Sequence, residues 1–211
     1  MSSHPAVYSD LPLFPLHCVL FPDGLLPLKI FEARYLDMTR TCLREDSPFG
    51  VCLIKSGTEV ATPDEPCVPE VVGCLATIEQ CDVDQFGMLR VRARGTHRFR
   101  LLSHRVEPSG LIVGMTEPIP DDVPLEGTDA LAKFGACAEV LERIIETICE
   151  RDPESLPFAK PFRLADPTWV SNRLSEVLQI PLRARQKLME LADAGARIDC
   201  VHHYMQQHRL L

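Results

Sequence analysis

A cluster of arginines is the feature of this sequence best suited to binding chemistry. Between positions 90 and 105 the chain carries six arginines and no acidic residue, although its net charge is −8. Guanidinium groups bind phosphate and carboxylate oxygens through paired hydrogen bonds. The cluster therefore suggests an anion-binding or RNA-binding face, made up of Arg90, Arg92, Arg94, Arg100 and Arg105. The alternative is a solvated sheet face whose arginines pair with neighbouring acids, and the negative net charge and scarce aromatic residues favour it.

Cysteine and histidine form no pattern typical of a catalytic or metal site. The nine cysteines are an odd number without CxxC spacing, and most have apolar neighbours. Such cysteines are typical of free, buried thiols in a reducing compartment. Cys67, Cys74 and Cys81 are seven residues apart, but alternate members would point to opposite faces of a strand. His202 and His203 would point about 100° apart on a helix. We expect neither a metal nor a cofactor.

Motifs of nucleotide hydrolysis and acyl transfer are absent from the sequence. It contains neither a GxxxxGK[ST] loop, which cradles phosphates, nor a GxSxG nucleophile turn. We therefore expect a binding protein and not an enzyme.

The first half of the chain is predicted to form short, kinked strands. Pro12, Pro15, Pro22 and Pro27 interrupt the apolar run 11–35. Because proline lacks an N–H and restricts the residue before it, no helix can run through this stretch. A small barrel or a strongly bent sheet is expected. The predicted strands are 11–16, 18–21, 25–30, 49–56, 71–82 and 111–116, with a turn at 22–24 and a hairpin turn at 84–87.

The segment 89–101 has the clearest alternating pattern. Its odd-numbered residues from 89 to 93 are apolar and its even-numbered residues are arginines, which indicates one buried and one solvated face. Gly95 is expected to break the run. The alternation should then resume with Phe99 and Leu101 on one face and Arg98 and Arg100 on the other.

Helical periodicity appears at 31–46, with Tyr35, Met38 and Cys42 on one face, and dominates after the proline-rich boundary 117–127. Asp166 before Pro167 is a typical helix start. We expect an α+β protein with a β-barrel subdomain at 1–117 and a helical subdomain at 118–211. The later helices are predicted at 128–150, 169–178, 181–191 (ended by Gly195) and 197–207. The first of these should be capped by Thr128 or Asp129. Its inward-facing residues should be Leu131, Phe134, Ala138, Leu141, Ile145 and Ile148.

Three stretches resemble a known family. The run LPLFPL…VLFP.G..LPL.IFE.RY at 11–35, followed by FGVCLI at 49–54, resembles the amino-terminal, substrate-binding domain of Lon-type proteases. VGCLATIEQ and the segment RGTHRF, with Arg94, Gly95, Arg98 and Phe99, resemble its second block. LSEVLQIPLRARQKLMELADAGARI resembles its helical half. The resemblance implies a PUA-like barrel followed by a helical bundle, and nothing in the chain resembles the ATPase or peptidase of a full-length Lon enzyme.

The function implied by this resemblance is non-enzymatic recognition of unfolded or degron-bearing polypeptides, with a full-length Lon-type protease as a conceivable partner. Glu32 and Arg34 would line the peptide surface or, alternatively, favour the helix dipole and tie the helix to the barrel. A small-molecule-binding protein and an RNA-binding module are the rival hypotheses. The chain is expected in the cytoplasm, since no secretory signal or membrane span is recognisable. The candidate peptide-binding residues are Phe31, Glu32, Arg34, Tyr35, Arg98 and Phe99.

Overall fold

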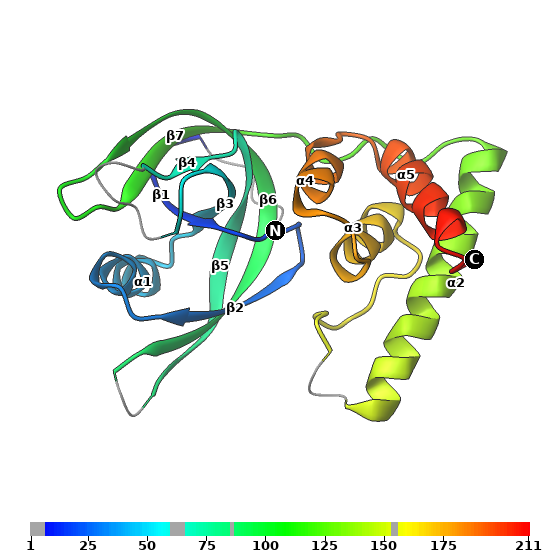
Figure 1. Ribbon diagram of the computed structural model, residues 1–211, viewed down its shortest axis with the longest axis horizontal. Coiled ribbons are helices and arrows are strands. Elements are labelled where there is room, and N and C mark those ends of the chain that lie inside the picture. The colour runs from blue at the N-terminus through cyan, green and yellow to red at the C-terminus, as the bar shows by residue number, and fades with distance from the viewer. Residues whose placement is uncertain (1–6, 60–65, 85–86, 153–155) are drawn as a thin grey trace. The chain divides into compact units, whose positions relative to one another are not determined.

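The computed structural model describes residues 7–59, 66–84, 87–152 and 156–211. It divides into two compact units, unit 1 (Met1–Ile119) and unit 2 (Pro120–Leu211). Unit 1 holds all the named strands and one helix, and unit 2 holds the remaining helices (Figure 1). This is the α+β class that the sequence predicts.

Unit 1 is built on one bent, mostly antiparallel sheet. The order of pairing is β1-β7-β6-β5-β3-β4, and β3 also pairs in parallel with β1, so the pairings run in a ring that returns to β1. β2 lies outside the ring and pairs with β6. The elements are β1 (Tyr8–Leu16), β2 (Leu25–Ile30), α1 (Ala33–Glu45), β3 (Phe49–Ser56), β4 (Val68–Pro69), β5 (Val72–Val83), β6 (Leu89–Val106) and β7 (Ile112–Pro118).

The strand predicted at 18–21 is wrong. These residues are not in a strand, although Val19, Leu20 and Phe21 are buried. The chain turns immediately afterwards, where Asp23 has a left-handed φ of 62° and the N–H of Gly24 donates to the carbonyl of Phe21. Burial here comes from packing against the sheet and not from a strand ladder. The predicted hairpin turn at 84–87 includes residues 85–86, which lie outside the described residues.

Two apolar clusters occupy opposite faces of the sheet. One contains Phe99 with Leu11 and Leu13. The other contains Phe14 and Phe49 and is covered by α1, whose buried residues include Tyr35, Met38 and Cys42, as the sequence predicts. Successive residues of β3 alternate between the clusters, with Val51 in the second and Cys52 in the first.

Glycine makes room for the Phe99 ring. A Cβ added at Gly73 would lie 2.5 Å from Phe99 Cζ, and one at Gly50 would lie 2.9 Å from the same atom. No larger residue fits at either position without displacing its neighbours. The Phe99 ring therefore packs directly against the backbone at Gly50 and Gly73.

The expected break in the alternation at Gly95 is confirmed, because Val91 and Ala93 lie in one apolar cluster and Phe99 and Leu101 in the other, although the strand itself continues and β6 is 18 residues long. Cys74 pairs with Arg98, whereas Ala76 pairs with Gly95, so one residue of β5 lies opposite two of β6. This β-bulge exchanges the two faces of β6. Gly95 is needed for another reason, since a Cβ there would lie 2.2 Å from the carbonyl oxygen of Phe21.

Two of the four described helices of unit 2 begin with an aspartate side-chain cap. The predicted cap Asp166 is confirmed, because its carboxylate accepts hydrogen bonds from the backbone N–H groups of Thr168 and Trp169. Pro181, which the sequence predicts to open a helix, is the N-cap of α4. The helices are α2 (Thr128–Arg151), α3 (Pro167–Val177), α4 (Leu182–Glu190) and α5 (Ala194–Gln207).

Three predictions for unit 2 are wrong. The N-cap of α2 is Gly127, at φ 93°, and neither Thr128 nor Asp129 caps the helix. Gly195 does not end α4; it lies in the first turn of α5, where its N–H donates to the capping Asp193. Leu131 is 51% exposed instead of facing inward. The buried stripe of α2 begins six residues later, at Cys137, which is nearly two turns.

The interior of unit 2 contains a buried ion pair. Arg197 is buried on α5, and its guanidinium binds both carboxylate oxygens of Asp122 and the carbonyl oxygens of Leu188 and Leu191. Trp169 is also buried, with its ring centroid 6.2 Å from that of Phe158. Within the described residues, no helix has both the length and the apolarity that crossing a membrane requires.

Candidate functional site

A hollow of about 480 Å³ lies beside α1 in unit 1. We call it the α1 hollow. Helix α1, strands β1 and β7, and the turn between β6 and β7 contribute to it. Its lining residues are Tyr8, Asp10, Leu11, Pro12, Arg34, Asp37, Met38, Thr41, Cys42, Glu45, Ser47, Pro48, Glu107, Ser109, Leu111 and Val113.

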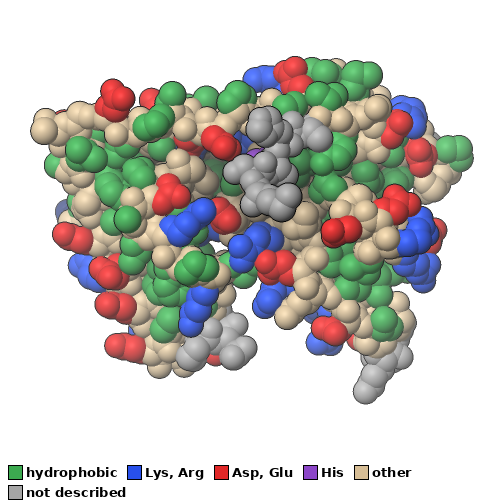
Figure 2. Space-filling model, turned by 180° about the vertical axis from the view of Figure 1, so that it is seen from behind, with side chains coloured by type: hydrophobic (Ala, Val, Ile, Leu, Met, Phe, Trp, Pro, Cys, Tyr) green, Lys and Arg blue, Asp and Glu red, His purple; other side chains and the backbone are tan. Residues whose placement is uncertain are grey.

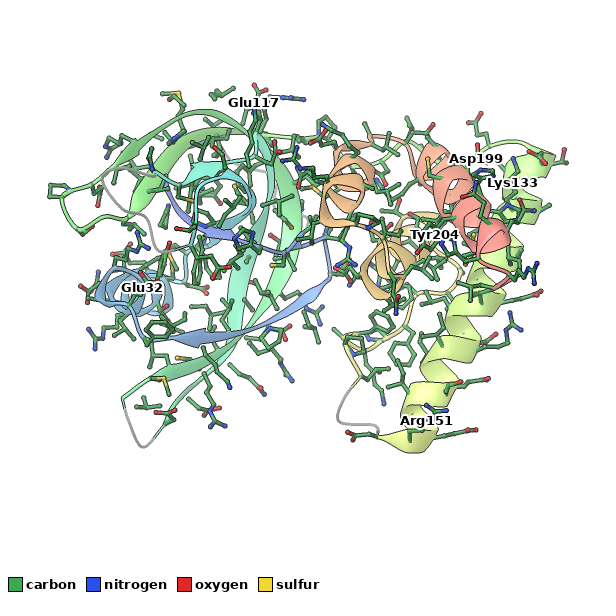
Figure 3. The ribbon with its side chains drawn as sticks, in the orientation of Figure 1. Glu32, Glu117, Lys133, Arg151, Asp199 and Tyr204 are labelled. Carbon is green, nitrogen blue, oxygen red and sulfur yellow. The ribbon has the colours of Figure 1, made fainter. Side chains whose placement is uncertain are left out.

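Arg34 fixes the start of α1 against the sheet. Its guanidinium donates to Glu32 Oε2 at 3.0 Å from Nε, to the carbonyl of Gly110 at 2.9 Å, and to the carbonyl of Glu59 at 2.9 Å. It also lies 4.6 Å from the centre of the Tyr35 ring. These contacts support the alternative expectation that Arg34 ties the helix to the sheet. Figure 3 shows Glu32 at the amino-terminal end of α1.

The floor of the α1 hollow is apolar. Leu11, Met38, Cys42 and Val113 are all buried beneath it. Burial raises the pKa of the Cys42 thiol, so this group stays uncharged at neutral pH. The floor can therefore accept an apolar side chain of a ligand without placing a charged group against it.

The rim of the α1 hollow is polar and exposed. Asp37 pairs with Arg40 at 2.9 Å, and Glu45 pairs with Arg44 at 2.9 Å. On the opposite side, Asp10 pairs with Arg105. The charged lining residues are four acids, Asp10, Asp37, Glu45 and Glu107, and one base, Arg34, around an apolar floor. Charged and hydrophobic side chains are intermixed on the face of the molecule drawn in Figure 2.

The predicted peptide-binding residues fall into different environments. Phe31 is 65% exposed, directly after β2. Tyr35 is buried and stacks on Phe14 with ring centroids 4.0 Å apart, and burial raises its pKa to about 12. Phe99 and Arg98 are buried as well. Of the six residues, Arg34 lines the α1 hollow; whether any of them contacts a polypeptide stays a prediction.

The arginines of β6 do not share one face. Before the bulge, Arg90, Arg92 and Arg94 point away from the apolar cluster that contains Val91. After the bulge, Arg98 pairs with Cys74, a member of that same cluster, so it lies on the opposite side from the first three. Arg100 follows the side of Arg98. The prediction that all these arginines form a single binding face is therefore wrong.

Most of these arginines have acidic partners. Arg94 lies 2.6 Å and Arg92 3.6 Å from Glu79, and Arg100 lies 3.3 Å from Glu117. Arg105 pairs with Asp10 and lies 3.5 Å from Glu107. The solvated face with ion-paired arginines, proposed as the alternative, describes these four residues better than an open anion site does.

No metal site is recognisable in the described ranges, since they hold no group of three or more His, Cys, Asp or Glu side chains placed to bind one ion. Sequence reasoning missed the α1 hollow itself. Its walls come from β1, α1 and the turn after β6, which lie far apart along the chain. The signal that was available is the Pro108-Ser109-Gly110 turn, whose carbonyl holds Arg34.

Comparison with known proteins identifies the family. Residues 10–207 match the model of the ATP-dependent protease La (LON) substrate-binding domain. The chain belongs to this family. No protease or ATPase domain is found in it, and its family assigns it to substrate recognition.

Similar proteins agree with this assignment. The crystal structure of a Lon N-terminal domain protein from Xanthomonas campestris is 34% identical, with a TM-score of 0.71, covering 92% of this chain and 97% of that one. The N-terminal domain of Lon protease from the Mycobacterium avium complex is 14% identical, with a TM-score of 0.63 over 95% of this chain and all (100%) of that one, and shows the shared fold.

A longer relative shows how much of a Lon protease the chain corresponds to. Lon protease 2 of Myxococcus xanthus is 20% identical over 205 residues, which are 94% of this chain and 24% of the relative. The chain thus spans about a quarter of the length of that protein.

Proposed function

We propose that the chain binds unfolded or degron-bearing polypeptide segments in the α1 hollow and performs no chemistry on them. The observation that carries this proposal is the combination of an apolar floor, formed by Leu11, Met38 and Val113, with an exposed charged rim. Membership of a substrate-binding domain family supports it.

The size of the α1 hollow suits one or two large side chains. Its volume of about 480 Å³ lies in the range of small ligand sites. An apolar side chain of the ligand would bury its surface on the floor, and the flanking peptide groups would remain at the polar rim. A disordered ligand loses conformational entropy when it orders, so each segment should bind weakly.

The α1 hollow is also held in place before any ligand arrives. Arg34 joins the start of α1 to the carbonyl groups of Gly110 and Glu59, and Tyr35 stacks on Phe14 below. A preformed site loses less entropy on binding than a mobile one.

The rival functions have less support. RNA binding is disfavoured because the arginines of β6 lie on two faces and four of them are ion-paired. Acid–base catalysis in the α1 hollow is disfavoured because Asp10, Asp37 and Glu45 are engaged by arginines. A bound small molecule would be an outcome of the experiment below.

The proposed partner is a full-length Lon-type protease to which captured segments would pass. The relative from Myxococcus xanthus carries a Lon protease name over a chain about four times as long. In this scheme the chain acts as an adaptor, and its expected location is the cytoplasm.

The test is a peptide array of unfolded sequences, read by capture of the purified protein at about 0.1 M and about 0.5 M salt. Thr41→Arg fills the α1 hollow from its wall, whereas Leu43→Arg adds the same side chain to an exposed site on the same helix outside it. We expect capture of apolar and aromatic peptides at both salt concentrations, lost in Thr41→Arg and kept in Leu43→Arg. Equal capture of peptides by both variants would show that the α1 hollow is not the binding site.

A further inference from the structure

A second hollow of about 450 Å³ lies on unit 1, across strands β2, β5 and β6. We call it the basic hollow. It lies on the side of β6 that carries Arg90 and Arg92, before the bulge. Its lining residues are Pro27, Leu28, Lys29, Gln80, Asp82, Arg90, Val91 and Arg92.

The strand register brings the cations of the basic hollow together. Lys29 of β2 is the direct partner of Arg90 on β6, and Pro27 is the partner of Arg92. On the other side of β6, Asp82 is the partner of Arg90. Side chains of directly opposed residues in a sheet have Cβ atoms about 5 Å apart. Two positive charges therefore face each other across the β2–β6 pair.

Lys29 and Arg90 differ in their ion-pair partners from Arg92 and Arg94 of β6. Glu79 holds Arg92 and Arg94, at 3.6 and 2.6 Å. Lys29 and Arg90 are exposed, and the described part of the chain provides neither with an ion pair within 4.0 Å. Like charges directly opposite each other destabilise a sheet, and a bound anion would relieve that repulsion.

We propose that the basic hollow binds an acidic side chain of an extended polypeptide, with the carboxylate between Lys29 and Arg90. This inference rests on the proposed function and names a class of segment that the chain would select. The exposed ring of Pro27 offers an apolar contact for the neighbouring ligand residue, and the exposed Phe31 follows β2 directly. The preferred segment thus carries an acidic residue beside an apolar one.

A polypeptide fits this charge pattern better than a nucleic acid does. Asp82 is the strand partner of Arg90, and Glu79 lies 3.6 Å from Arg92 of the same hollow, so both acids would repel the successive phosphates of a polyanion. The lining residues include no aromatic side chain on which a base could stack. A single carboxylate can contact Lys29 and Arg90 without extending over the neighbouring acids. It also needs no aromatic side chain for stacking.

The experiment uses fluorescence polarisation with two labelled peptides, one alternating aspartate and leucine and one with asparagine in place of aspartate. Lys29→Gln and Arg90→Gln each remove one cation. Lys55→Gln is the matched control, since Lys55 is exposed at the end of β3 and lies outside the hollow. We expect the aspartate peptide to bind more tightly than the asparagine peptide, and each hollow variant to weaken binding of the aspartate peptide about two- to fivefold, as for an exposed charged contact. The control should match the unaltered protein.

Each other outcome overturns the inference in a distinguishable way. Equal binding of the two peptides, or no effect of Lys29→Gln and Arg90→Gln, would remove the basic hollow and leave the proposed function standing. Tight, salt-sensitive binding of a single-stranded RNA oligonucleotide, lost in the same two variants, would replace the polypeptide with a nucleic acid. If neither peptide binds, the inference fails, and the apolar peptide array with Thr41→Arg then decides the proposed function separately.

Discussion

Arg197 and Asp122 form a bidentate ion pair in the interior of unit 2, with Nη1 2.6 Å from Oδ2 and Nη2 3.2 Å from Oδ1. Side-chain exposure is 1% for Arg197 and 3% for Asp122. The same guanidinium binds the carbonyl oxygens of Leu188 and Leu191, which end α4. The segment before α2, the end of α4 and helix α5 are therefore joined through one side chain.

Replacement of Arg197 should strongly destabilise unit 2. Arg197→Ala removes the guanidinium from the buried Asp122 carboxylate, and we expect a loss of about 3–5 kcal/mol in the free energy of unfolding, measured with urea. The control is Lys133→Ala, whose ion pair with Asp199 is exposed (Figure 3) and should contribute far less. A similar loss in both variants would contradict the central role of Arg197.

Gly50→Ala should destabilise unit 1. The added Cβ would lie 2.7 Å from Leu13 Cδ2 and 2.9 Å from Phe99 Cζ, and overpacking of this kind costs about 1–3 kcal/mol. Gly135→Ala is the matched control, because nothing lies within 4 Å of its Cβ and it sits inside α2. It should stabilise unit 2 by about 0.5–1 kcal/mol. Denaturant melts of both variants check the opposite signs.

The cysteines should react with an alkylating reagent in order of exposure. Cys200 is exposed, whereas Cys52 and Cys137 are buried. Burial raises the pKa of both buried thiols, to about 12 for Cys137, so little reactive thiolate is present at neutral pH. Peptide mass spectrometry after timed alkylation should find Cys200 modified first. Rapid modification of Cys52 in the folded protein would contradict the packing around Phe99.

Arg34→Lys should loosen the turn between β6 and β7 although the charge is kept. A lysine ammonium cannot reproduce the separate contacts of the guanidinium with Glu32, Gly110 and Glu59. We expect faster hydrogen exchange at the backbone amides of residues 109–111. Arg40→Lys, on the exposed face of the same helix, should leave that exchange unchanged.

Unit 1 should lose stability in alkali through Tyr35. Burial raises its pKa from 10.0 to about 12, so the folded state favours the neutral phenol. The resulting stabilisation is complete below pH 10 and is lost as the pH rises from about 10 to about 12. The melting temperature of Tyr35→Phe should fall less steeply across this pH range than that of the unaltered protein. Parallel curves would show that another group causes the loss.

Local signals in the sequence predicted much of the fold. The bounds of β2 and β3, the buried face of α1 and the Asp166 cap each depend on a few neighbouring residues, and each was correct. The family resemblance then supplied the α+β arrangement, which the match over residues 10–207 supports.

The failures arose where distant segments decide the outcome. Leu131 has the spacing of a buried residue, but nothing covers it in the described part of unit 2, and it stays 51% exposed. The arginines of β6 have a regular alternation that a bulge opposite Leu75 reverses. That reversal depends on the partner strand and leaves no mark in the arginine pattern itself. The α1 hollow was missed for the same reason, since Asp10 and Glu107 meet only after folding.

The ring of strand pairings in unit 1 also constrains the order in which a newly made chain can assemble. β5 and β6 are joined by a short connection and can form a hairpin early, whereas β1 must wait for β7, with Tyr8 finally beside Thr116. β1, the first of the named strands of unit 1 to be made, is therefore among the last to find all its neighbours. Because the apolar residues Leu11 and Leu13 pack in a cluster that also contains Phe99 and Ile112, this cluster is completed only after β7 has been made.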